Sequence, residues 1–243
     1  MGHSQREMLV ILDSALQSQF GVSINECGSL DGVHIYLDDG IFSGGHVIKD
    51  LSKWISSDAP QNADLRVVTV AQYLSGCWQA EKELVKVIKA SGKEVDLSFW
   101  CSLPLEDRLF KKNHADVFWP RAIPASAQGY FDSFTRPLEL RTAAESSKNE
   151  VFIDDNVRSL SEDAFIEKGL WIRQQCSGLN DYQRPLGNSV WEKPGFGATF
   201  VTFRNCANNA PLVFWAGDPW YPLFPRKTNT DTALINAFDN LWE

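Results

Sequence analysis

The segment from residue 33 to residue 57 most constrains the fold, because it places a short strand-like run, two carboxylates, a glycine turn and an amphipathic helix in direct succession. Residues 33–37 are mostly apolar and predict a strand that is buried on both faces. The acidic pair Asp38-Asp39 follows, and Ser43-Gly44-Gly45 supplies small residues that permit a tight turn. Apolar residues then recur at the spacing of one buried helix face: Val47, Leu51, Trp54 and Ile55.

A helix is expected before this segment, and the order of strand and helix repeats after it. The expected elements are a helix at 5–20, a strand at 65–71, a helix at 77–90 that stops at Ser91-Gly92, and a strand at 95–100. Strands that alternate with helices in this way predict an α/β fold with a mainly parallel sheet and flanking helices. In such folds ligands bind beyond the carboxyl ends of the strands, which is where the acidic pair and the glycine turn would lie.

Beyond about Pro120 the helical and strand periodicities fade into sequence rich in proline, glycine, asparagine and aromatic residues. The aromatic side chains need burial, so this region is not expected to be disordered. We therefore predict a nucleotide-binding core over residues 1–128 and an irregular, aromatic-rich C-terminal extension over residues 129–243 that packs on the core. Short strands are predicted within the extension at 151–153, 199–203 and 212–215, and the acidic pair Asp154-Asp155 is interpreted as a solvated strand end, with a metal or ligand site as the alternative.

Composition excludes some classes of function. The formal net charge of -8 argues against a surface that binds nucleic acid mainly by neutralising its phosphates. The first residues lack the apolar centre of a secretory signal, and no apolar run is as long as a membrane span, so we expect a cytoplasmic protein without a membrane partner. The five cysteines are widely spaced and form no C-x-x-C pair, which favours reduced thiols over a disulfide framework or a zinc site.

The turn after the acidic pair has the residue types that a phosphorylated sugar requires. Main-chain amides of residues 43–46 are expected to converge at a helix N-terminus, where unpaired N–H groups and the helix dipole favour an anion. Asp38 and Asp39 can accept hydrogen bonds from vicinal hydroxyls, or hold Mg²⁺ through water. The alternative is a plain turn at a strand end, since Asp and Gly are favoured in turns whatever the function.

The whole stretch from Val33 to His46 resembles the motif that binds 5-phosphoribosyl 1-pyrophosphate (PRPP) in type I phosphoribosyltransferases. In addition, residues 115–120 and 220–226 look like a divergent bacterial branch of phosphoribosyltransferase-like proteins, some of which are associated with antiphage systems such as retrons. The resemblance implies a Mg-PRPP site in which Asp38 and Asp39 are the catalytic carboxylates, meet the ribose hydroxyls and contact the metal indirectly. It implies the following ligands to phosphate and ribose: Asp38, Asp39, Gly40, Ser43, Gly44, Gly45 and His46.

Three positions depart from the family's pattern. Phe42 stands where purine-salvage members often have an acid, so it supplies no general base. His46 stands where threonine is common. Only Met1 to Ser4 precede the first helix, where family members place a strand and a pyrophosphate-binding loop, which leaves open whether the core naturally lacks its first strand or the sequence is a fragment.

Other residues are weaker candidates. Ser75 and Gly76 follow the strand at 65–71 on the same sheet edge, where they would line the acceptor pocket or form a plain connection. Four cations are candidates for contacts with pyrophosphate or a partner through charge-assisted hydrogen bonds, the alternative for each being a solvated surface charge: Arg121, Arg204, Arg226 and Lys227.

Three functions remain open at this stage. The first is a protein that binds PRPP or a related nucleotide with Mg²⁺ and transfers ribosyl phosphate to a nitrogen nucleophile or cleaves an N-glycosidic bond. The second is a catalytically inactive effector or assembly subunit of a bacterial antiphage complex, with a reverse transcriptase, structured DNA or a DNA-binding subunit as partners. The third is a toxin that uses water as the acceptor. An oligomer is compatible with each of them.

Overall fold

A computed structural model describes residues 3–29, 32–142, 151–176, 178–202 and 206–224. The chain divides into two compact units, Met1–Leu105 and Glu106–Glu243. The segment from 106 to 128, which the sequence analysis assigned to the core, thus belongs to the second unit. Among the described residues, no helix is long and apolar enough to cross a membrane.

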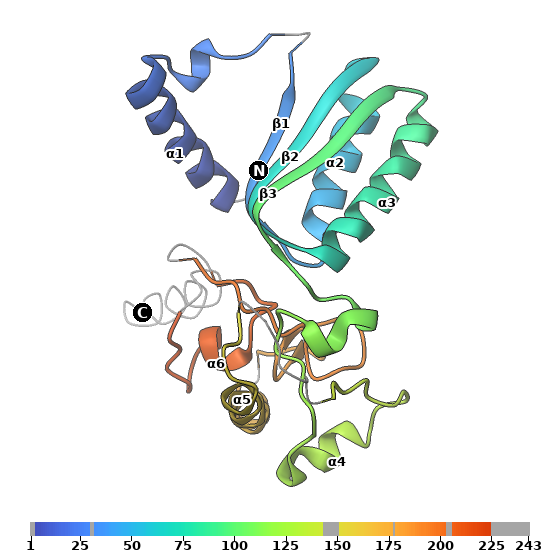
Figure 1. Ribbon diagram of the computed structural model, residues 1–243, viewed down its shortest axis with the longest axis vertical. Coiled ribbons are helices and arrows are strands. Elements are labelled where there is room, and N and C mark those ends of the chain that lie inside the picture. The colour runs from blue at the N-terminus through green and yellow to red at the C-terminus, as the bar shows by residue number, and fades with distance from the viewer. Residues whose placement is uncertain (1–2, 30–31, 143–150, 177, 203–205, 225–243) are drawn as a thin grey trace, which may run out of the picture. The chain divides into compact units, whose positions relative to one another are not determined.

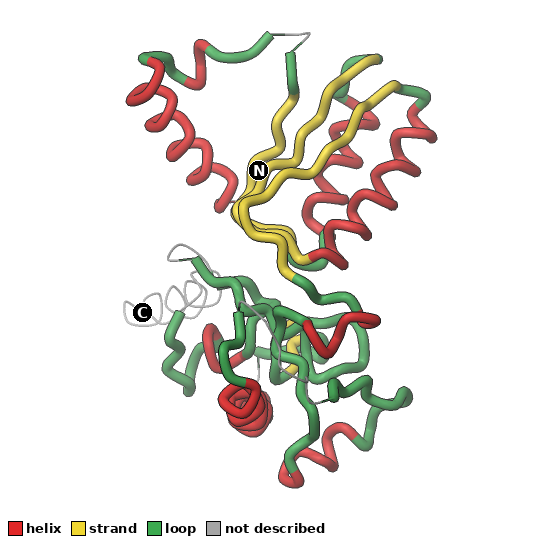
Figure 2. Tube along the Cα trace, viewed as in Figure 1, coloured by secondary structure: helices red, strands yellow, loops and turns green. Residues whose placement is uncertain are grey.

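The first unit is built on a three-stranded parallel sheet in the order β1-β2-β3 (Figures 1 and 2). Its strands are β1 (His34–Ile41), β2 (Asn62–Tyr73) and β3 (Glu94–Leu105). The helices α2 (Gly45–Ser57) and α3 (Leu74–Ser91) cover one face, and α1 (His3–Phe20) lies on the other side of the sheet against β1. A short 3-10 helix, η1 (Ile24–Glu26), follows α1. The α/β fold with a parallel sheet and flanking helices is thereby confirmed.

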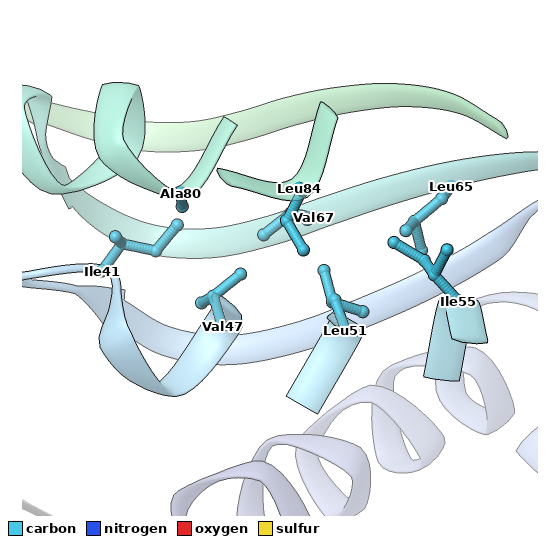
Figure 3. Close-up of a cluster of buried hydrophobic side chains, with 8 residues drawn as sticks. All are labelled: Ile41, Val47, Leu51, Ile55, Leu65, Val67, Ala80 and Leu84. Atoms are coloured by element: carbon cyan, nitrogen blue, oxygen red, sulfur yellow. The ribbon is translucent and has the colours of Figure 1, made fainter. Parts of the chain in front are cut away.

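The core of this unit lies between the sheet and the α2–α3 layer (Figure 3). Eight buried side chains form it: Ile41, Val47, Leu51, Ile55, Leu65, Val67, Ala80 and Leu84. The spacing of Val47, Leu51 and Ile55 in the sequence therefore identified the buried face of α2, while Trp54 packs at its margin. Burying one such aliphatic side chain contributes roughly 1.5–3 kcal/mol, so this layer anchors the loop that precedes α2.

The predicted end of α3 is also confirmed. Gly92 caps the helix in the left-handed conformation, with a φ of 67°, which a glycine adopts without steric strain. Gln61 reaches across to this turn, since its side-chain amide donates to the Gly92 carbonyl at 2.9 Å. The turn returns the chain to the sheet, where β3 pairs with β2 in parallel register.

The second unit is largely irregular around one long helix, α5 (Asp155–Gln175). Its other described elements are short: η2 (Leu109–His114), η3 (Ala125–Ala127), α4 (Gln128–Phe131), β4 (Gln183–Arg184), β5 (Gly187–Asn188) and α6 (Leu212–Trp215). A small core of Ala127, Phe131, Ile166 and Leu186 joins α5 to the segments around it, with further aromatic side chains at its edge.

Three strand predictions in this unit are wrong. Residues 151–153 form no strand, because Asp154 ends the segment as the N-cap of α5. Residues 212–215 form the helix α6, which begins directly after Pro211. The described residues of 199–203 contain only an isolated bridge between Val201 and Cys206.

Candidate functional site

The acidic pair lies within β1, near its carboxyl end, and not beyond it. β1 continues to Ile41, and its register against β2 pairs Asp38 with Thr69 and Gly40 with Ala71. The Asp38 side chain is buried and that of Asp39 is half-buried. The main-chain N–H of Asp39 donates to Asp38 Oδ1 at 2.9 Å, which orients the first carboxylate along the strand. The pairing of β1 with β2 thus holds both carboxylates next to the loop that follows β1.

That loop is open to solvent. Ser43, Gly45 and His46 are exposed, and only Gly44 among residues 43–46 is buried. Within the part of the chain that the structure describes, no main-chain carbonyl accepts a hydrogen bond from the amides of these four residues. The first N–H groups of α2 therefore point to solvent with their donors unused, which is the arrangement that binds anions at helix N-termini.

The two glycines of the loop serve different purposes. Gly44 has a φ of 80°, and a Cβ on it would lie 2.5 Å from the carbonyl oxygen of Gly76, so glycine is required there by both conformation and packing. A Cβ on Gly45 would meet nothing nearer than Ser43 Oγ at 3.8 Å. The space in front of Gly45 is consequently empty and wide enough for a ligand atom.

Gly76 lies behind the loop, in the first turn of α3. A Cβ at this position would lie 1.7 Å from the carbonyl oxygen of Phe42, so α3 can approach the loop only because residue 76 is glycine. Ser75, its neighbour, is half-buried. Gly76 packs directly against the main chain of the loop. Its role as part of an acceptor pocket remains a prediction.

The matching family model, PRTase-CE, spans residues 1–226 and thus includes β1 and its loop. The chain belongs to the PRTase-CE family. This family is phosphoribosyltransferase-like, which confirms the resemblance of residues 33–46 at the level of the family. No curated protein and no solved structure matched the chain.

In this PRTase-CE chain two further residues contact the acidic pair, and sequence reasoning missed both. The hydroxyl of Tyr36 lies 3.5 Å from Asp38 Oδ2 and 3.3 Å from Asp50 Oδ2, so it joins β1 to α2. Tyr36 could have been found because residues 36 and 38 share one face of a strand. Asp50 left no such signal, since its approach depends on how α2 packs against the sheet.

The surroundings of Asp39 disfavour its ionised form. Burial, followed by the charge of Asp38, raises the pKa of Asp39 from 3.8 to about 6. Burial and then the charges of Asp38 and Asp50 also raise the pKa of the Tyr36 phenol, which stays a neutral donor. This chain therefore concentrates carboxylates at the end of β1, next to main-chain donors that have no carbonyl acceptor in the described residues, and a ligand with both hydroxyls and a phosphate would complement both.

The remaining candidates lie in the second unit or outside the described residues. Arg121 pairs with Asp155 at 3.0 Å, and Asp154 accepts hydrogen bonds from the amides of Asn156 and Val157 at 2.7 and 3.0 Å. The interpretation of Asp154-Asp155 as a solvated strand end is wrong, because the first residue caps a helix and the second belongs to an ion-pair cluster. The other candidate cations, Arg204, Arg226 and Lys227, lie outside the described residues.

Proposed function

We propose that the end of β1 and the loop 42–46 bind the ribose 5-phosphate part of PRPP or of a related nucleotide. The observation that carries the proposal is the open loop: the amides of residues 43–46 have no carbonyl acceptor in the described part of the chain, and the space in front of Gly45 is empty. These amides would hold the 5-phosphate by charge-assisted hydrogen bonds at a helix N-terminus. Membership of a phosphoribosyltransferase-like family agrees with this ligand class.

Asp38 and Asp39 would accept hydrogen bonds from the two ribose hydroxyls. Their positions at the end of one strand fix the sugar relative to the phosphate held by the loop. The described residues contain no group of three or more potential metal ligands. The adjacent carboxylates of Asp38 and Asp39 suit a Mg²⁺ ion that arrives with the diphosphate of PRPP, because Mg²⁺ is commonly bound through one or two carboxylates together with substrate phosphates. When bound, that ion would neutralise charge on the diphosphate.

The chemistry proposed for this site is transfer or cleavage at C1 of the ribose. The bond from C1 to the leaving group breaks as a bond to a nitrogen nucleophile or to water forms. This chain would contribute by fixing the sugar through the two carboxylates and the phosphate through the loop, since positioning supplies much of the rate in such reactions. The main-chain donors lie at the start of α2, where the helix holds them in fixed directions.

The Gly45→Val variant tests the ligand. A side chain at position 45 would occupy the space proposed for the phosphate, while the fold offers no steric conflict there. We expect the affinity for Mg-PRPP, measured by calorimetric titration, to fall at least about tenfold, or about 1.4 kcal/mol. Gly129→Val is the matched control, because a Cβ at Gly129 meets nothing within 4 Å and so, as at Gly45, causes no steric conflict. Equal affinity of both variants and the wild type would refute the phosphate assignment.

Binding without turnover is the second candidate function, and Phe42 favours it. This residue packs its ring against Tyr73 at a centroid distance of 5.5 Å and offers no acid or base to the loop. In such a protein, nucleotide binding would change its interaction with the partners of a defence complex, such as a reverse transcriptase or a DNA-binding subunit. Mass spectrometry of Mg-PRPP incubated with the protein, in water alone and with a panel of nitrogen-containing acceptors, separates the two candidates, because only an enzyme releases diphosphate.

A further inference from the structure

In the part of the chain that the structure describes, β1 and β3 are the two edge strands of the sheet. Within the described residues, β1 has one neighbouring strand, β2, so its other edge has no strand beside it (Figure 2). Alternate residues of an edge strand direct their N–H and C=O groups away from the sheet, where they can pair with a further extended chain. Proteins usually cover or charge such an edge, because it can pair with another chain.

A cavity of about 610 Å³ runs along this edge. Four consecutive residues of β1, His34 to Leu37, line it. Because side chains alternate between the two faces of a strand, four successive residues can border one cavity only if it follows the main chain at the edge. Gln5 and Leu9 of α1 form one wall, and residues 50–58 of α2 contribute the other. We call this cavity the β1 groove.

The walls of the β1 groove combine apolar and acidic side chains. Leu9, Leu37 and Trp54 supply apolar surface, and Asp50 and Asp58 outnumber the single cation, Lys53. One polar atom in the same region lacks a partner, since His34 Nε2 is buried and makes no hydrogen bond in the described part of the chain. A complementary occupant has main-chain groups along its length, apolar side chains and a basic side chain.

We propose that the β1 groove binds an extended segment of a partner polypeptide, which adds to β1 as a fourth strand and directs a Lys or Arg side chain toward Asp58. Main-chain hydrogen bonds to the free edge supply affinity, and alternate side chains that contact α1 and α2 supply specificity, as in other cases of strand addition. Only an extended polypeptide matches a row of main-chain donors and acceptors at this spacing. This proposal does not depend on the ligand of the loop 42–46.

A library of displayed 12-residue peptides, selected on the full-length protein, is the probe. We expect the enriched peptides to alternate apolar and other residues and to share a basic position. Hydrogen exchange with mass spectrometry should then show that bound peptide protects amides within residues 34–41. N-methylation of alternate peptide amides should abolish binding, because it removes the donors that a strand needs.

Matched charge reversals locate the peptide. Asp58→Lys, in the wall of the groove, should weaken binding of a basic peptide about two- to fivefold, the range for an exposed ion pair. Glu94→Lys makes the same change of charge at the start of β3, at a residue that does not line the groove, and should leave affinity unchanged. Three results would overturn the proposal: no enriched peptide, protection confined to amides outside β1, or a dimer of the chain in sedimentation that itself protects β1 and excludes peptides.

Discussion

Replacing Asp39 by asparagine should stabilise the first unit at neutral pH, although it removes a proposed ribose ligand. Burial and the charge of Asp38 raise the pKa of Asp39 from 3.8 to about 6. Between these two values the folded chain holds a proton that the unfolded chain has released, so the free energy of unfolding falls as the pH rises. The destabilisation is absent below the lower value and complete above the higher one.

The magnitude follows from the two pKa values. Their difference corresponds to about 3 kcal/mol at 1.36 kcal/mol per pKa unit. Asp39 is half-buried, and solvent screens its charge, so we expect Asp39→Asn to raise the free energy of unfolding by about 1–2 kcal/mol at about pH 7.5. At about pH 4 the carboxyl is protonated in the folded state, and the gain should be close to zero.

Native-state hydrogen exchange of β2 amides provides the assay, since it reports on opening of the first unit alone. At about pH 7.5 the variant should exchange about 5–30 times more slowly than the wild type at the same pH. Asp96→Asn, which removes an exposed carboxylate from β3, is the control for net charge. A slowing that is equal at both pH values, or faster exchange in Asp39→Asn at neutral pH, would refute the reasoning.

Two further substitutions test the packing around the site and within the second unit. Gly76→Ala would place a Cβ 1.7 Å from the Phe42 carbonyl oxygen, so we expect a loss of about 1–3 kcal/mol in a urea titration, together with weaker binding of Mg-PRPP; unchanged stability would show that α3 does not support the loop. Glu162→Ala leaves Arg141 and Arg158 without the buried carboxylate that lies 2.9 Å from each, and should destabilise the second unit by about 3–5 kcal/mol in the same titration. A loss below about 1 kcal/mol would mean that the cluster relaxes into solvent.

The parts of the fold that could be predicted depend on neighbours in the sequence. The core face of α2, the cap at Gly92 and the succession of strand, loop and helix all follow from local spacing. The close contact between Gly76 and Phe42 could not be predicted in this way, because it joins segments that only tertiary packing brings together. The same holds for Asp50, whose position beside Tyr36 depends on how α2 packs against the sheet.

Helix α5 was missed for a different reason. Its buried residues do recur at helical spacing: Arg158, Glu162, Ile166, Gly169 and Ile172. Two of them, Arg158 and Glu162, are charged. A search for apolar residues at helical spacing therefore does not detect the buried face in the first half of the helix. Arg158 and Glu162 are buried as a pair, and Arg141 completes the cluster from outside the helix. Charged residues are buried only when they have partners, and one of these partners, Arg141, lies outside the helix. The burial of this face therefore could not be predicted from the sequence of the helix alone.

The hydroxyl of Tyr36 has one proton and two acceptors, Asp38 toward the loop and Asp50 toward the β1 groove. Asp50 lines the groove, so a bound strand that occupied this carboxylate would favour the hydrogen bond from Tyr36 to Asp38, and a ligand that occupied Asp38 would favour the hydrogen bond to Asp50. Thermodynamic linkage makes the two effects equal in free energy. A strand bound at the edge of the sheet and a nucleotide bound at its end would thus each change the affinity for the other through the Tyr36 hydroxyl, without any movement of the main chain.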